Sequence, residues 1–157
     1  NITNDTLFEG ATAETFNVNL VTPSNATIAD NLGLGSITDN DLAPTVSTVS
    51  AASATEATSI VHTVTLSNAS TTATTFALSL GGGTATGGGT DYTSTLVNGN
   101  FSDGVTISGG TITVPAGVTS FTVTVPTTTD LPDETDENYN LTVGAITGDG
   151  DHMPGPA

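Results

Sequence analysis

The sequence contains no lysine and no arginine, whereas it has 16 aspartate and glutamate residues in 157, so its formal net charge is -16 at pH 7. The carboxylates therefore have almost no basic side chains to pair with, and clustered carboxylates repel one another unless a cation joins them. Lys and Arg are also the residues that contact nucleic-acid phosphates and anionic membrane surfaces. Their absence excludes nucleic acid and anionic membranes as partners.

Cysteine, tryptophan and glutamine are absent as well. The lack of Cys excludes disulfides, thiolate nucleophiles and zinc–thiolate sites. The lack of Lys and Gln excludes isopeptide bonds to Asn and Thr–Gln esters. Two isolated His residues do not suffice for a zinc site. No Ser–His–Asp arrangement and no cleft with paired carboxylates can be identified, so we expect the chain not to be an enzyme.

The chain also lacks segments that would place it in a membrane. No apolar run approaches the roughly 20 residues of a membrane helix, and the sequence does not begin with a signal peptide. Its first residue is Asn1 instead of Met. We expect a processed product or an excised piece of a longer protein, located outside the cell or on its surface, without membrane insertion.

What the sequence does contain is a strong alternation of polar and apolar residues. Hydrophobic content is 35% and aromatic content 4%, and the prominence of Val, Ile, Leu and Thr favours strands over helices. Six segments have the period of two that is typical of strands, namely 15–20, 59–66, 75–80, 111–114, 120–125 and 138–143. Gly-rich turns lie between several of them, which predicts an all-β antiparallel sandwich. His62, in the second segment, is expected at the surface.

An internal repeat is indicated by two similar segments. Glu14–Val18 (ETFNV) resembles Glu137–Leu141 (ENYNL), 123 positions later, and each follows an acidic loop. Residues 1–42 are then the last strands of a preceding repeat, and residues 43–157 form a repeat that lacks its own last strand. The equivalent of Gly33–Asp41 would start near residue 156, where the sequence ends. The alternative is a chance match between two acidic strand starts.

Several motifs, in the right order, resemble those of Calx-beta domains. They are ITDND at 37–41, TEA at 55–57, GTDYT at 89–93 and DETDENY at 133–139, with a further acidic loop at 9–16. The resemblance covers nearly the whole chain, and such domains occur in tandem in very large bacterial adhesins. It implies an Ig-like Greek-key antiparallel β-sandwich, here about one and a third tandem repeats, with a calcium cluster at one end.

The resemblance also implies a set of calcium ligands. In the second repeat these ligands are Glu56, Asp91, Asp133, Glu134 and Glu137. In the first repeat they are Asp39 and Asp41 of the closing strand, with Glu9 and Glu14 of the acidic loop. The sequence departs from the pattern of Calx-beta domains in two ways. The second repeat has no closing Asp-x-Asp, and the first has no early glutamate of its own.

The residues favour calcium without the resemblance too. Ca²⁺ takes about six to eight oxygen ligands in irregular geometry, and loops rich in Asp, Glu, Asn and Gly at strand ends can supply them. The sequence has no EF-hand pattern. The alternative is a solvated acidic surface, but the lack of basic residues to pair with the carboxylates favours bound Ca²⁺ as the cofactor.

Three functions follow from these patterns. The first is a calcium-rigidified structural repeat, an extender in a secreted or surface-anchored adhesin whose partners are neighbouring repeats or copies. The second is a self-assembling filament subunit, in which the Gly33–Asp41 strand of a neighbouring copy completes the sandwich by β-strand complementation. The third is a calcium-dependent carbohydrate-binding module, for which few aromatic residues are available.

Overall fold

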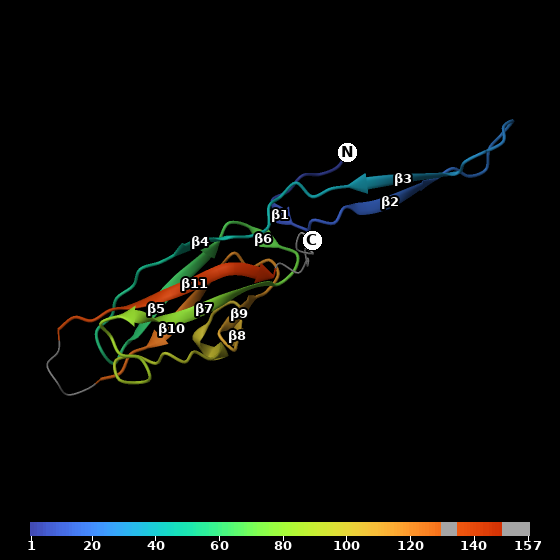
Figure 1. The fold of residues 1–157 in the computed structure, drawn as a ribbon. Coiled ribbons are helices and arrows are strands. Elements are labelled where there is room, and N and C mark those ends of the chain that lie inside the picture. Colours follow the sequence, from blue (N-terminus) through green and yellow to red (C-terminus); the bar gives the residue numbers. More distant parts are fainter. Residues whose placement is uncertain (130–134, 149–157) are drawn as a thin grey trace, which may run out of the picture.

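A computed structural model describes residues 1–129 and 135–148 of the chain. The molecule is elongated, with a β-sandwich and a two-stranded hairpin that projects from one end of it (Figure 1). Apart from the three-residue 3-10 helix Asn98–Asn100 (η1), the described residues form strands and loops. The predicted all-β class is confirmed.

The sandwich consists of two antiparallel sheets. The first sheet has the order β10-β5-β4, with strands Ser120–Pro126 (β10), Ser59–Leu66 (β5) and Val46–Val49 (β4). The second has the order β11-β7-β9-β8, with strands Tyr139–Gly148 (β11), Thr74–Gly83 (β7), Thr111–Val114 (β9) and Thr106–Ser108 (β8). The edge strands β4 and β11 lie against each other, so they border the same side of the sandwich.

The six segments with alternating residues all overlap strands; the first of them, 15–20, overlaps Glu14–Asn19 (β2). Alternation explains the burial in the sandwich, because side chains two residues apart point to the same face of a sheet. In β10, for example, Phe121, Val123 and Val125 are buried, and the residues between them are only half-buried. The Ig-like Greek-key order and the number of repeats stay predictions.

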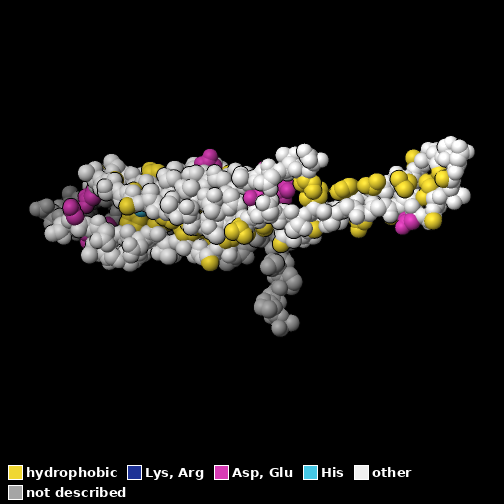
Figure 2. Space-filling view, turned by 90° about the horizontal axis from the view of Figure 1, so that it is seen from above, with side chains coloured by type: hydrophobic (Ala, Val, Ile, Leu, Met, Phe, Trp, Pro, Cys, Tyr) yellow, Lys and Arg dark blue, Asp and Glu magenta, His cyan; other side chains and the backbone are white. Residues whose placement is uncertain are grey.

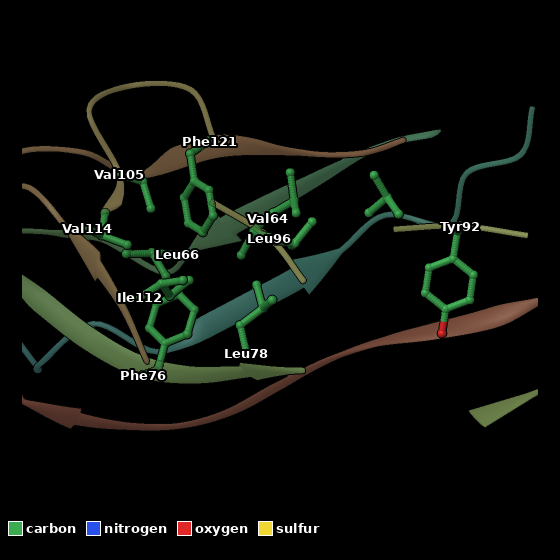
Figure 3. Packing of buried hydrophobic residues seen from close by; sticks show 12 residues of the cluster. Val64, Leu66, Phe76, Leu78, Tyr92, Leu96, Val105, Ile112, Val114 and Phe121 are labelled. Carbon is green, nitrogen blue, oxygen red and sulfur yellow. The ribbon is translucent and has the colours of Figure 1, made fainter. Parts of the chain in front are cut away.

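The core lies between the two sheets. Phe76 of β7 and Phe121 of β10 point toward one another, with ring centroids 6.3 Å apart (Figure 3). Val64, Ile112 and Val114 fill the space around them and are fully buried. Burying each such side chain stabilises the fold by about 1.5–3 kcal/mol, so this cluster is the main stabilising element of the sandwich.

His62 belongs to this interior, and the prediction that it lies at the surface was wrong. It is in phase with Val64 and Leu66 on the inner face of β5, and it is only 7% exposed. Burial is tolerated because both ring nitrogens have partners: Nδ1 lies 2.8 Å from the Ser50 carbonyl oxygen and Nε2 lies 2.8 Å from the Tyr139 hydroxyl.

The projecting hairpin is formed by β2 and Leu32–Ile37 (β3), which pair antiparallel. Two short contacts join it to the sandwich. Leu7–Phe8 (β1) pairs parallel with Ala69–Ser70 (β6), and Phe8 is buried at this junction. After β3, the chain returns to the sandwich through Pro44, which is also fully buried.

Candidate functional site

A cavity of about 660 Å³ lies at the end of the sandwich away from the hairpin. Three stretches that are far apart in the sequence meet there: the loop before β5, the loop after β7, and the segment that leads into β11. Four carboxylate residues line the cavity, namely Glu56, Asp91, Asp136 and Glu137. Figure 2 shows acidic side chains gathered at this end of the molecule.

The loop that carries Asp91 is closed by its own hydrogen bonds. The Asp91 carboxylate accepts a hydrogen bond of 2.5 Å from the Thr86 backbone N–H, and the Asp91 N–H donates to the Thr86 carbonyl oxygen at 3.0 Å. The Asp91 carbonyl oxygen accepts from the Thr128 N–H at 2.9 Å. These bonds fix Asp91 between the loop after β7 and the end of β10.

Two stacked tyrosines form one wall of the cavity. The rings of Tyr92 and Tyr139 are 4.6 Å apart, and His62 meets Tyr139 edge-on at 5.7 Å. Desolvation, and then the proximity of Tyr92, raises the pKa of Tyr139 to about 12. Tyr139 is therefore a neutral phenol at physiological pH, and it can both donate and accept a hydrogen bond.

The structure thus brings together three of the ligands implied for the second repeat, Glu56, Asp91 and Glu137. Asp136 lines the same cavity and was missed, although it lies inside the acidic motif at 133–139. Asp133 and Glu134 lie outside the described residues.

The four ligands implied for the first repeat lie elsewhere, at the junction between hairpin and sandwich. The Asp39 carboxylate accepts hydrogen bonds from the backbone N–H groups of Glu9 at 2.7 Å and of Asp41 at 2.9 Å. The N–H groups of Asp41 and Glu9 lower the pKa of Asp39 because they stabilise its charged form.

The same junction raises the pKa of Glu9. Partial desolvation is the largest cause, followed by the negative charges of the nearest carboxylates, Glu14, Asp5, Asp39 and Asp41. Glu9, Glu14, Asp39 and Asp41 therefore form one electrostatic group, here called the junction cluster. The predicted ligands that the structure describes are therefore divided between the cavity and this junction cluster.

The donor types at the cavity fit a hard cation. Carboxylate, hydroxyl and carbonyl oxygens are the ligands that Ca²⁺ takes, whereas His62 has both nitrogens engaged in the interior. Within residues 1–129 and 135–148, no three His, Asp or Glu side chains converge closely enough to hold a metal ion. The described residues thus offer the right chemistry without a closed coordination sphere.

No family model matches the chain, and searches of curated proteins and of solved structures found no match. In the described ranges there is also no helix that is long and apolar enough to cross a membrane. The resemblance to Calx-beta domains stays a prediction, and the function is argued below from the sequence patterns and the geometry.

Proposed function

We propose that this chain is a calcium-binding structural repeat, a non-enzymatic extender of a secreted or surface-anchored adhesin. The observation that carries the proposal is the meeting of Glu56, Asp91 and Glu137 at one cavity. They come from three separate segments of a chain that has no Lys or Arg to neutralise them. A cation is the simplest remaining means of balancing their charges.

Within the cavity, Glu56, Asp91, Asp136 and Glu137 would hold the metal. Bound Ca²⁺ supplies positive charge that replaces repulsion among the carboxylates with attraction. Because the unfolded chain does not hold these segments together, calcium stabilises the native state by mass action, by about 2.7 kcal/mol at 100 times the dissociation constant.

A cation at the junction cluster would have a second role, because it would stiffen the connection between the hairpin and the sandwich. The hairpin meets the sandwich at Glu9, Asp39 and Asp41, where like charges accumulate. A cation bound there would hold both sides of the junction together. The repeat would then be a stiff spacer with calcium and a more easily bent one without it.

Thermal unfolding in calcium and in excess chelator tests the proposal at a protein concentration low enough to keep the chain monomeric. We expect calcium to raise the melting temperature, and the triple variant E56Q/D91N/E137Q to lose that rise. The control D30N removes one charge near the hairpin tip and keeps the Asp30 Oδ1 acceptor for the Leu32 N–H. An unchanged melting temperature of the native sequence in calcium would contradict the proposal.

The carbohydrate-binding alternative stays a prediction, and nothing in the described part of the chain favours it. Of the two rings in the cavity wall, Tyr92 is 3% exposed and lies stacked against Tyr139. A sugar would need an accessible aromatic face, and this stacking occupies the closest one.

A further inference from the structure

One side of the sandwich has two open strand edges. In the described part of the chain, β11 pairs only with β7, and β4 pairs only with β5. Strands β5, β7, β9 and β10 all contribute buried core residues, whereas no described side chain of β4, β8 or β11 is buried. Leu141, Val143 and Ile146 of β11 pack against the core but stay partly exposed. An open edge beside an incompletely covered core is a site for the addition of another strand.

The hairpin carries the second uncovered apolar surface of the chain. Phe16 and Val18 lie on the same face of β2 and are 51% and 53% exposed, and Leu20 follows them in the same phase. Figure 2 shows hydrophobic side chains running along the hairpin. The opposite face is mixed, because Leu34 is paired with Asn17 and Leu32 with Asn19. Contiguous exposed apolar surface of this kind marks an interaction site.

We infer that the hairpin of one copy docks on the open edge of the next copy, with β3 added to β11, so that the chains join head to tail. A second copy is the occupant because β3 is already paired with a segment that resembles the start of β11. Its partner β2 carries ETFNV, and β11 begins within the similar ENYNL. Because β2 occupies one edge of β3, β11 of the next copy would join the edge that β2 leaves free, and the two similar segments would flank β3.

The strand directions agree with this arrangement. Strand β3 runs toward its own sandwich, whereas β11 runs toward the end that carries the hairpin (Figure 1). A second copy placed ahead of the hairpin in the same orientation therefore presents β11 antiparallel to β3. The contact is heterologous and does not close, so repetition produces a linear fibre.

The alignment of β2 with β3 gives the register that we expect at the free edge of β3. Phe16 is paired with Gly35 and Asn17 with Leu34, so Tyr139 of the next copy would face Gly35, and Asn140 would face Leu34. The phenyl ring of Phe16 lies over Gly35, where a Cβ atom would come within 2.4 Å of it. Phe16 and Val18 would then cover the partly exposed core of the next copy, and the mixed face of the hairpin would stay in solvent.

This register has an electrostatic consequence that rests on the proposed function. Glu14 is paired with Ile37, so Glu137 of the next copy would face Ile37. The junction cluster of one copy would then lie beside the acidic cavity of the next. Copies of net charge -16 repel each other, so we expect assembly in calcium and none in chelator.

Cysteine cross-linking tests the register, because the native chain has no Cys that could interfere. The L34C/N140C variant is oxidised in calcium and separated by non-reducing electrophoresis. We expect a ladder of covalent oligomers, since both side chains lie on the outer face in the proposed contact. The L32C/N140C variant is the control: it is two residues out of register, beyond the short Cα separation that a disulfide needs.

A second pair of variants tests the docking face without cysteine. V18D places a charge on the apolar face, and L34D places the same charge on the mixed face of the same hairpin. Sedimentation in calcium should show assembly of L34D and at least a tenfold loss of assembly for V18D. Both variants should keep the melting temperature of the sandwich, because the hairpin contributes no residue to the core cluster.

Monomers in calcium, or equal cross-linking of the two cysteine pairs, would overturn the inference. These results are distinguishable from failure of the proposed function. A calcium-dependent melting temperature at high dilution without cross-linking would leave the calcium repeat standing and remove the docking. Cross-linking in register without any effect of calcium on the melting temperature of the dilute monomer would support the docking and remove the calcium repeat.

Discussion

The Nε2 atom of His62 lies 2.8 Å from the phenolic oxygen of Tyr139, and this contact joins the two sheets beside the acidic cavity. Because the Ser50 carbonyl can only accept, Nδ1 carries the proton in the neutral ring, and Nε2 accepts from the Tyr139 hydroxyl. A hydrogen bond between the interior of β5 and the first residue of β11 thus positions the strand that leads out of the acidic loop.

Replacing Tyr139 by Phe should destabilise the protein by about 1–3 kcal/mol, because Nε2 of the buried His62 loses its partner. The ring itself is kept, so stacking on Tyr92 should survive. Urea unfolding of Y139F against the native sequence measures the change. Identical midpoints would show that the hydrogen bond contributes nothing.

Ionisation of Tyr139 should destabilise the fold at high pH. Its pKa is raised to about 12 in the folded state, against about 10 in an unfolded chain. The folded state therefore favours the neutral phenol, and this contribution is complete below about pH 10 and is lost as the pH rises toward 12. Ultraviolet absorbance should show one tyrosine titrating near pH 12, and that step should be missing in Y139F.

At the junction cluster, Asp39 and Glu9 should affect stability in opposite directions. The lowered pKa of Asp39 means that its contribution is present above the unfolded value of about 3.9 and is lost as the pH falls through the folded value. The raised pKa of Glu9 means that its charged form is unfavourable in the folded state, and this cost disappears in acid.

Two neutralising variants check these signs at pH 7 in the absence of calcium. D39N should lower the melting temperature and speed hydrogen exchange at the N–H groups of Glu9 and Asp41, which donate to the Asp39 carboxylate. E9Q should raise the melting temperature. Changes of the same sign in both variants would contradict the electrostatic description of the junction cluster.

The core makes a further prediction. Phe76 is fully buried against Phe121, so F76A should cost about 3–5 kcal/mol of unfolding free energy. The matched control is F16A in the hairpin, where the ring is half exposed and the stability of the sandwich should hardly change. A loss for F16A as large as that for F76A would show that the hairpin folds as one cooperative unit with the sandwich.

The strands could be predicted from the sequence because alternation is a local signal. Segment 59–66 coincides with β5 and segment 111–114 with β9. Burial could not be predicted in the same way, since it depends on whether a second sheet covers the strand. Segment 15–20 has the same alternation as β10, yet all of its side chains are exposed, because no second sheet covers β2.

The candidate site was predictable only in part, because sequence motifs are local whereas the site joins distant segments. The motifs named Glu56, Asp91 and Glu137, but only the fold shows that their segments meet at one cavity. The parallel pairing of β1 with β6 had no signal in the sequence, because two-residue strands have no measurable periodicity. His62 was misplaced because a polar residue within a strand was assigned to the outer face in spite of its phase.

The hairpin is attached to the sandwich at two points, through the pairing of β1 with β6 and through Pro44. A single linker would act as a hinge, whereas two attachments resist torque, since bending toward one side must stretch one connection and compress the other. A force applied at the hairpin tip is thereby transmitted to the sandwich, because the junction does not bend freely. A pull on the tip would be divided between β2 and β3, because each strand has its own attachment to the sandwich.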